Sequence, residues 1–336
     1  MNKIVLAAAL AAFALPAAAL DKMPEPGWGG FVDLGVGTGN MESNFLARIP
    51  GIDADLSKQT ISSLDSPDDE DFTIPSVNYS FGYTFDSGKT RIFLGSDLAD
   101  FLQFDSSTKL ALRHDFDTLG RVQVALLAQS YPGVEVWEDP YLLDAKRDET
   151  EKTNTGGRLT LDKIFGTHFE LKLTAREIDL DEERSGEGLG LSNAERKLLD
   201  REGDKTRAEL GYLFMMDGGR HVIRPSVAYI DHDLDGDAMS QDGYEVGVSY
   251  LFNASNFRMA ASALYQDMVG DKENPIFNEV NDAEVYAIGA QMFFPGAFGL
   301  EKWVPKVGMI YSDNDSDIDF NDSTGWLISA GMFRNF

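Results

Sequence analysis

The 336-residue chain has no cysteine and only 4 histidines. The lack of cysteine excludes a disulfide framework and also the lipidated N-terminal cysteine of a lipoprotein. Basic residues are scarce beside acidic ones, with 29 Lys and Arg against 56 Asp and Glu and a formal net charge of −27 at pH 7. Because such a chain repels a polyanion over most of its surface, we expect no nucleic-acid partner.

Long apolar runs are also missing, apart from one at the N-terminus. The chain begins MNKIVLAAALAAFALPAAAL, in which a basic start and a short apolar stretch end in small residues. This arrangement is typical of a secretory signal peptide, so we expect 1–19 to be removed and 20–336 to form one exported domain. No later stretch approaches the ~18 consecutive apolar residues that predict a transmembrane helix.

Helical periodicity is nearly absent, and we predict one short helix, at 191–202. The dominant pattern is alternation. In SVNYSFGYTF (76–85) the apolar and aromatic residues occupy one set of alternate positions and the polar residues and glycine the other. Period two over this length predicts a strand with one apolar and one polar face. The pattern recurs at 170–176, 207–214, 244–252, 257–265 and 326–336.

Fourteen such segments are predicted, and the connections between them alternate strictly between short and long. This asymmetry is typical of an outer-membrane barrel, with short periplasmic turns, long external loops and an even number of strands. We therefore predict an all-β fold: a transmembrane antiparallel β-barrel of about 14 strands in the outer membrane of a Gram-negative bacterium, with both termini periplasmic. Twelve to sixteen strands are compatible with the pattern, since the segment at 91–96 is short.

Charge is distributed unevenly between the predicted loops and the strands. The long connections are strongly acidic, whereas the polar faces of the strands carry more Lys and Arg than Asp and Glu. Charged side chains are tolerated inside a barrel but are costly on its lipid face, so these basic residues are expected to face the lumen. Such residues either serve anion passage or pair with carboxylates across the wall. The lumen-lining candidates are Arg113, Arg158, Lys172, Arg176, Arg207 and Arg258.

The stretch DHDLDGDAMSQD (231–242) matches the spacing of a calcium-binding loop. Carboxylates occupy the ligand positions and Gly236 occupies the turn position. Two observations oppose calcium binding: the flanking segments read as strands, and the last ligand is Asp rather than the usual bidentate Glu. The alternative is a solvated, turn-forming external loop. The candidate calcium ligands are Asp231, Asp233, Asp235, Asp237 and Asp242.

The sequence gives little support for an enzyme, and its loop aromatic residues have two possible roles. His232 lies between two aspartates near the external rim, but no feature holds Ser240 against it, so we expect no enzyme and no catalytic residue. The loop aromatics Trp137, Tyr141 and Phe277 either form an exposed recognition surface or fold their loops inward over the barrel mouth. Inward folding is favoured, since aromatic residues of this kind more often fold a long loop over the barrel mouth.

The predicted external loops contain five short sequence motifs, which are, in chain order, VWEDPY (136–141), ERSG (183–186), DLDGDAMS (233–240), NPIF (274–277) and SDIDF (316–320). Together with the signal peptide they resemble a family of Gram-negative exported proteins, the domain of unknown function 2860. The resemblance spans nearly the whole mature chain. It implies an outer-membrane barrel and supplies no catalytic residues.

These patterns lead to two expectations about function. The first is a porin-like passive channel for small solutes, anions in particular, with no required cofactor. The second is a non-conducting structural or surface-binding barrel, whose acidic loops bind divalent cations such as Ca²⁺ and, through them, lipopolysaccharide. In either case the expected partners are outer-membrane lipid and lipopolysaccharide.

Overall fold

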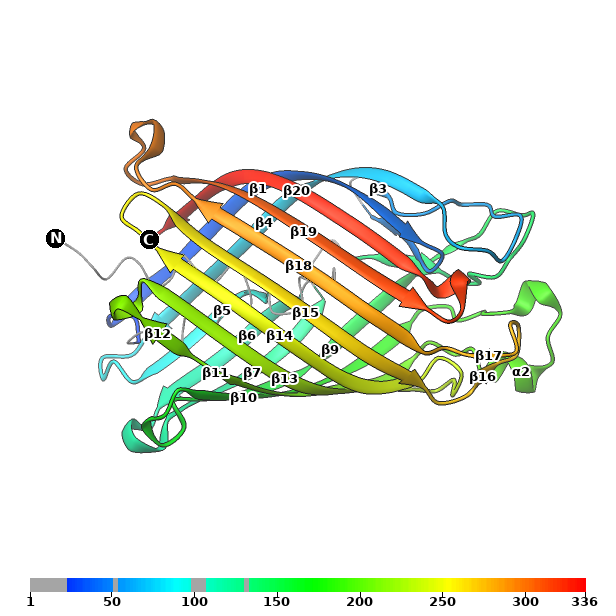
Figure 1. Cartoon of the computed structure of the whole chain (residues 1–336), viewed down its shortest axis with the longest axis horizontal. Helices are drawn as coiled ribbons and strands as arrows, with labels where there is room; N and C mark the ends of the chain where they lie inside the picture. The colour runs from blue at the N-terminus through cyan, green and yellow to red at the C-terminus, as the bar shows by residue number, and fades with distance from the viewer. Residues whose placement is uncertain (1–22, 51–53, 98–106, 130–132) are drawn as a thin grey trace.

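The computed structural model describes residues 23–50, 54–97, 107–129 and 133–336. The predicted signal peptide lies outside the described residues. Strands tilted to a common axis form one closed antiparallel wall (Figure 1). The wall strands are β1 (Gly27–Ser43), β4 (Asp69–Thr84), β5 (Thr90–Asp97), β6 (Ser107–Asp115), β7 (Arg121–Gln129), β9 (Glu149–Asp162), β10 (Phe169–Leu180), β11 (Gly203–Tyr212), β13 (His221–Leu234), β14 (Gln241–Asn253), β15 (Arg258–Gly270), β18 (Ala283–Phe293), β19 (Val304–Ser316) and β20 (Ser323–Asn335).

The barrel closes where its first and last strands pair. The β1–β20 register runs from Phe31 opposite Asn335 to Ser43 opposite Ser323. Beyond it, the amides of Gly30 and Phe336 each donate to the carbonyl oxygen of the other, both at 3.0 Å. Closure satisfies the backbone groups of both edge strands, as a membrane-spanning sheet requires. The prediction of a closed barrel with 14 wall strands is confirmed.

The two ends of the barrel differ, as the alternating connections predict. One end, the short-turn end, holds the turns after β4, β6, β9, β12 (Phe214–Met216), β14 and β18. The other, the long-loop end, holds the long connections, and β1 begins and β20 ends away from it (Figure 1). Loop 1 (44–68) contains β2 (Leu46–Ile49) and β3 (Ala54–Asp55), and loop 3 (130–148) contains β8 (Glu135–Trp137). Loop 4 comprises 181–202 and loop 7 comprises 317–322. Loop 6 (271–282) contains β16 (Glu273–Asn274) and β17 (Glu279–Val280).

Several strands extend further toward the long-loop end than the alternation predicts. β4 begins at Asp69, and half of the predicted external loop 231–242 lies in strands, because β13 continues to Leu234 and β14 begins at Gln241. Above the membrane both faces of a strand meet water, so polar side chains on both faces conceal the period-two pattern.

The predicted helix at 191–202 is shorter than expected. Only Asn193–Lys197 form α2, which starts at a capping box between Ser192 and Glu195. Beyond it the chain turns so that Leu199 is fully buried among other loops. Tertiary packing here overrides the helical propensity of the segment. Within the described residues no helix is long and apolar enough to cross a membrane, a finding that does not bear on crossing by strands.

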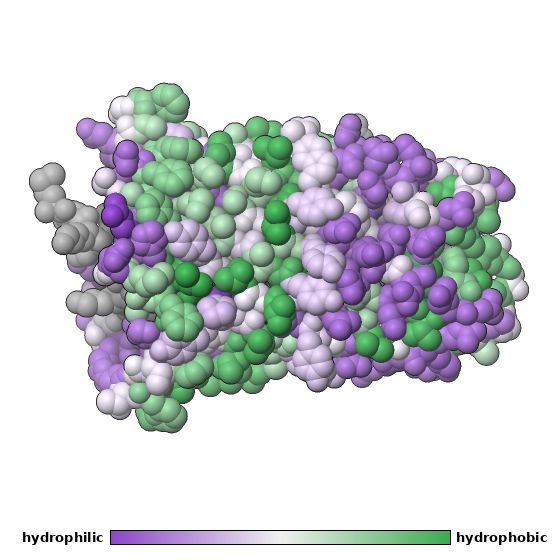
Figure 2. Space-filling view, viewed as in Figure 1, coloured by the Kyte–Doolittle hydropathy of each residue, from purple (hydrophilic) through white to green (hydrophobic). Residues whose placement is uncertain are grey.

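The outer surface of the wall has the layered character of a membrane-spanning barrel. On the face that Figure 2 shows, an apolar band crosses the wall, and the surface toward the long loops is strongly hydrophilic. Outward side chains in the band, such as Val77 and Leu126, are 59% and 65% exposed. Aromatic residues border the band on both sides, as in outer-membrane barrels. At the short-turn side they include Trp28, Phe81, Tyr83, Phe169, Tyr212, Phe252 and Phe257, and at the long-loop side Tyr229, Tyr244, Tyr265, Tyr286, Tyr311 and Trp326.

Beyond the second aromatic row, carboxylates project outward from the extended strands. Tyr229 donates its hydroxyl to Asp242 at 3.1 Å, and Tyr286 donates to Glu284 at 2.7 Å. We call this group the carboxylate collar. Its position places negative charge just outside the apolar band. It consists of Asp231, Asp233, Asp242, Asp267, Glu284, Asp313 and Asp315.

Candidate functional site

The inward face of the barrel is basic on one side. On these strands alternate positions face the lumen, and the positions between them, such as Leu112 and Leu173, are exposed to lipid. All six lumen-lining candidates lie at inward positions. On the adjacent strands β5, β6, β7, β9, β10 and β11 the inward basic residues form what we call the basic wall: Arg91, Lys109, Arg113, Arg121, Lys152, Arg158, Lys172, Arg176, Lys205 and Arg207.

Small side chains recur on the opposite side of the lumen, together with a cluster of Phe31, Phe293 and Phe333 toward the short-turn end. On β1 and β20, Gly35 lies directly opposite Gly331, and Gly35 also faces Ser76 of β4. The side chains here take up little space, so the lumen is asymmetric in both charge and bulk. The other small inward residues of these and neighbouring strands include Gly37, Gly39, Ser80, Ser262, Ala287, Gly289, Gly308, Ser312 and Ser329.

Part of the basic wall is neutralised by carboxylates across neighbouring strands. Arg224 of β13 donates to Glu170 at 2.7 Å and also to Glu209, and Lys172 lies 3.3 Å from both carboxylates. Arg207 bridges Glu209 and Glu245 at 2.5 and 2.6 Å. For Lys172 and Arg207, therefore, the structure favours pairing across the wall, one of the two roles that the sequence left open.

A different arrangement occurs toward the short-turn end of β5 and β6. Arg91 and Arg113 are directly opposite each other in the β5–β6 register. Their guanidinium carbons lie 5.3 and 5.7 Å from the ring centre of Phe93, and the Lys109 ammonium lies 6.0 Å from it. Arg91 donates to the carbonyl of Gly29 at 3.3 Å, and Arg113 donates to the side chain of Gln123. Within the described residues neither guanidinium forms an ion pair.

The other lumen candidates bond to neutral groups as well. Arg158 donates to the hydroxyl of Thr174 at 2.8 Å, and Arg176 donates to that of Ser107 at 2.7 Å. Arg258 of β15 is half-buried at the short-turn end of the opposite side, away from the basic wall. The register therefore groups five of the six candidates and separates Arg258 from them.

At the long-loop end, side chains of the described loops form a packed hydrophobic core, which we call the loop dome. Tyr141 and Phe320 are fully buried, with ring centres 5.1 Å apart. Six loops contribute, so the inward folding expected for Tyr141 and Phe277 is confirmed. The dome residues are Phe45, Ile61, Leu64, Tyr141, Leu189, Leu191, Leu199, Met239, Ile276, Phe277, Ile318 and Phe320.

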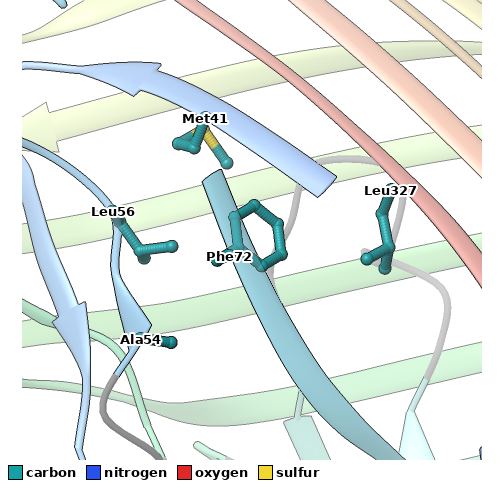
Figure 3. Packing of buried hydrophobic residues seen from close by; sticks show 5 residues of the cluster. All are labelled: Met41, Ala54, Leu56, Phe72 and Leu327. Atoms are coloured by element: carbon teal, nitrogen blue, oxygen red, sulfur yellow. The ribbon is translucent and has the colours of Figure 1, made fainter. Parts of the chain in front are cut away.

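Loop 1 also enters the barrel mouth. Its Ala54 and Leu56 pack against Met41 of β1, Phe72 of β4 and Leu327 of β20, three inward side chains of the wall (Figure 3). β2 pairs with β8 of loop 3, and β8 in turn pairs with β9 of the wall. Loops 1 and 3 are therefore joined to each other by backbone hydrogen bonds and to the wall by both packing and pairing.

Two buried charges in loop 3 hold the dome together. The fully buried guanidinium of Arg147 donates to the carbonyls of Asn44 and Pro140, both at 3.0 Å, and to that of Lys58. It also lies 4.5 Å from the ring centre of Trp137. Burial lowers the pKa of Arg147 to about 10, so it remains charged at neutral pH.

The second buried charge is the carboxylate of Asp139. It accepts hydrogen bonds from the backbone amides of Tyr141, Gly186 and Gly188 at 2.8 to 3.1 Å. Loop 4 is held by Arg201 as well, which bonds Glu183 at 2.7 Å and two backbone carbonyls of loop 3. The five sequence motifs that carry the family resemblance all contribute residues to the loop dome and its supporting contacts. These residues are Trp137, Asp139, Tyr141, Glu183, Met239, Ile276, Phe277, Ile318 and Phe320.

The candidate calcium ligands are dispersed. Asp231 and Asp242 face each other in the β13–β14 ladder and project outward with Asp233, while Asp237 lies 3.3 Å from Lys272. Gly236 packs against the backbone of loop 4 rather than inside a metal loop, since a Cβ there would meet the amide of Asp200 at 2.4 Å. No group of three metal-ligating side chains is assembled in the part of the chain that the structure describes. Calcium binding by these residues stays a prediction.

Ser240, one of the residues considered for a hydrolase, is held by the turn between β13 and β14. The hydroxyl of Ser240 exchanges hydrogen bonds with the backbone of Leu234 at 2.9 and 3.1 Å, which closes the β13–β14 turn. His232 pairs in register with Gln241 and Lys205. Ser240 therefore has a structural role in the turn.

With this geometry in place, the chain can be compared with known proteins. Residues 27–334 match the model of the family described as "Protein of unknown function (DUF2860)". The chain belongs to this family. The match covers the complete barrel of this DUF2860 protein, from β1 to β20. No curated protein matches it in sequence.

Solved outer-membrane proteins resemble the barrel at low sequence identity. A FadL homologue of Pseudomonas aeruginosa has a TM-score of 0.45 at 10% identity, over 97% of this chain and 96% of that one. The CymD monoaromatic hydrocarbon channel has a TM-score of 0.47 at 9% identity, over 95% and 91%. The anion-selective porin from Comamonas acidovorans has a TM-score of 0.38 at 8% identity, over 92% and 98%. Likenesses of this size say nothing about what passes through the present barrel.

Proposed function

We propose that this DUF2860 protein is an outer-membrane channel for small anionic solutes, with its short turns in the periplasm and its long loops outside the cell. The observation that carries the proposal is the asymmetry of the lumen. Basic side chains are concentrated at the inward positions of six adjacent strands, whereas glycine, alanine and serine recur at the inward positions of the other side. A lumen with one basic side attracts anions and disfavours cations.

The loop dome implies that passage is controlled at the external mouth. Its core spans six loops and includes fully buried aromatic residues, so a solute entering from outside has to displace or bypass packed side chains. We therefore expect a small conductance in the resting state. Loosening the dome should raise it.

The test is single-channel recording in planar bilayers, with salt gradients that report ion selectivity. We expect anion-selective current, and a fall in the anion-to-cation permeability ratio in the Arg158→Gln/Arg176→Gln double variant. Removing a charge that acts on an ion at contact distance through water is worth about 1 kcal/mol, or about fivefold per charge. The matched control is Arg220→Gln/Lys302→Gln, which removes two cations from the short turns outside the basic wall.

A second candidate function is a non-conducting barrel that binds lipopolysaccharide through divalent cations. It is favoured by the carboxylate collar beside the second aromatic row, where cation-bridged phosphate groups would lie. In this case a dome-loosened Phe320→Ala variant would remain electrically silent. Mg²⁺ would raise the thermal midpoint of the wild-type protein, and the rise would shrink in an Asp267→Asn/Glu284→Gln variant. Anion current from either wild type or Phe320→Ala would exclude this candidate.

A further inference from the structure

Arg91 and Arg113 form a like-charge pair that is unusual in a protein wall. They are direct cross-strand partners on the inward face of β5 and β6. Like charges directly opposite each other in a sheet destabilise it. By contrast, Lys172, Arg207 and Arg224 of β10, β11 and β13 lie within 4 Å of carboxylates, but no described carboxylate lies within that distance of either guanidinium of the pair.

The surroundings of the pair hold both guanidiniums at one place. Phe93 faces inward two residues after Arg91 on β5. Its ring contacts the guanidinium groups of Arg91 and Arg113 and the ammonium group of Lys109. Cation–π contacts of this kind favour a positive charge without neutralising it. Gly29 and Gln123 each accept one hydrogen bond, and the Nε atoms of both arginines are buried without a partner. The pair is therefore positioned and still positively charged.

Nearby acidic groups do not cancel this charge. Asp162 and Asp115 lie 3.9 and 3.5 Å from Arg121, a third guanidinium beside the pair. Asp162 and Glu170 act on Arg113 only at longer range. Glu170 is itself bonded to Arg224. The local excess of positive charge thus remains on Arg91 and Arg113.

From this arrangement we infer that Arg91, Arg113 and Phe93 form a binding site for a small oxyanion, a phosphate or a carboxylate, at the short-turn end of the lumen. Guanidinium groups present pairs of N–H donors that match the oxygen spacing of these anions. A bound oxyanion would separate the two positive charges and satisfy donors that now have no partner. The inference rests on the proposed function, since it identifies the binding site that an anion crossing the lumen would occupy last before it reaches the periplasm.

The test is equilibrium binding, which does not require current. Purified barrel in nonionic detergent is titrated calorimetrically with sodium phosphate, and with sodium chloride at equal ionic strength as the reference. Wild type is expected to show saturable phosphate heat. Loss of charge-assisted hydrogen bonds worth about 1.5–3 kcal/mol should weaken phosphate binding about tenfold or more in Arg91→Gln/Arg113→Gln. The control Arg220→Gln/Lys302→Gln, which also lacks two cations near the short turns, should keep the wild-type affinity.

A second measurement separates binding from a purely structural role. Without phosphate, the Arg91→Gln/Arg113→Gln variant should have a thermal midpoint equal to or above that of wild type. The repulsion that is removed offsets the lost contacts with Gly29, Gln123 and Phe93, and no ion pair is lost. Phosphate should raise the midpoint of wild type and of the control only. Absence of saturable phosphate heat in wild type, an unchanged affinity in the double variant, or a lowered midpoint of the phosphate-free variant would each overturn the site.

Failure of the site and failure of the channel give different results. A protein that binds phosphate through these arginines but passes no current refutes the channel and leaves the site. A protein that passes anion-selective current, while its phosphate binding is indifferent to Arg91→Gln/Arg113→Gln, refutes the site and leaves the channel.

Discussion

Arg147 is fully buried in the loop dome although it carries a positive charge. A buried cation is stable only where hydrogen bonds and polarizable groups replace its water. Here three carbonyls of loops 1 and 3 and the face of Trp137 do so. The side chain therefore ties together two loops that are far apart in sequence.

Replacing Arg147 by Met is expected to loosen loops 1 and 3. The substitution roughly keeps the apolar bulk but leaves three buried carbonyls without a donor, at a cost of about 1–3 kcal/mol for each unsatisfied group. Deuterium exchange in loops 1 and 3 should accelerate while exchange in the β18–β20 wall stays slow. The matched control is Lys146→Met, because the neighbouring Lys146 is exposed. Equal exchange in the two variants would contradict the role of Arg147.

The sequence places individual charges on the lumen face but does not identify their partners. Alternation alone puts Arg113 and Arg207 inward, and both are inward in the structure. Arg91 lies on the same face, yet its partnership with Arg113 depends on the register across the long link between β5 and β6. Long links do not fix a register as a tight turn does, so the pair is visible only in the folded barrel.

At the scale of elements, the inward glycines of β1 show how the closing seam is built. A Cβ at Gly39 would come within 2.1 Å of the carbonyl oxygen of Trp326 and 2.9 Å of the Phe72 ring. A Cβ at Gly29, on the same strand, would meet only the carbonyl oxygen of Phe336, at 3.5 Å. Neither glycine has a positive φ, so the difference between them lies in the available space.

This pair gives a prediction about the seam. Gly39→Ala should destabilise the barrel by about 1–3 kcal/mol, the usual cost of overpacking, because the β1 and β20 backbones have to separate. Gly29→Ala should change its stability little. Urea unfolding of the barrel in lipid vesicles, followed by tryptophan fluorescence, measures both. Equal urea midpoints for the two variants would contradict the prediction, because they would show that the β1–β20 seam accommodates an added methyl group without loss of stability.

The hairpin formed by β13 and β14 shows how context changes the meaning of a motif. As sequence, 231–242 fits a calcium loop; in the barrel, Asp231 and Asp242 become cross-strand partners on the outer face. A strand sends alternate side chains to opposite faces, so ligands spaced for one compact loop diverge when the segment is extended. Titration with Ca²⁺ remains the direct test of binding at these carboxylates.

At the scale of the whole molecule, the dominant property is the excess of negative charge at the long-loop end. Burial, followed by repulsion from neighbouring carboxylates such as Asp242, raises the pKa of Asp271 in loop 6. Burial also raises the pKa of Asp322 in loop 7, where Asp315 adds repulsion. In loop 4 the hydrogen bond from Arg184 lowers the pKa of Glu187. The loops therefore respond to pH in opposite directions.

The signs predict which loops tighten in acid. A carboxyl group whose pKa is raised on folding contributes stability that is complete below its unfolded pKa and is lost as pH rises through the folded value. Loops 6 and 7 should thus be better protected near pH ~4, the ordinary Asp range, than at neutral pH. In loop 4 the contribution of Glu187 changes in the opposite direction, because it is lost as pH falls through the lowered pKa of that carboxyl group.

The measurement is deuterium exchange at both pH values, corrected for intrinsic exchange rates, together with channel current. Protection of loops 6 and 7 should increase in acid, and the current should fall as the dome tightens. An Asp271→Asn/Asp322→Asn variant should show the acid-like protection at neutral pH. Protection that decreases in acid in these two loops would contradict the assignment.

Sequence alone determined the closed barrel with its 14 wall strands, the acidity of the long connections and which faces of the strands meet lipid. These properties follow from period-two alternation and from the length and composition of the connections, which are local. Only the tertiary structure decided that six loops pack into a dome around Tyr141 and Phe320, and that Arg91 faces Arg113. Both depend on contacts between segments distant in sequence, where register, loop path and packing volume choose the partners.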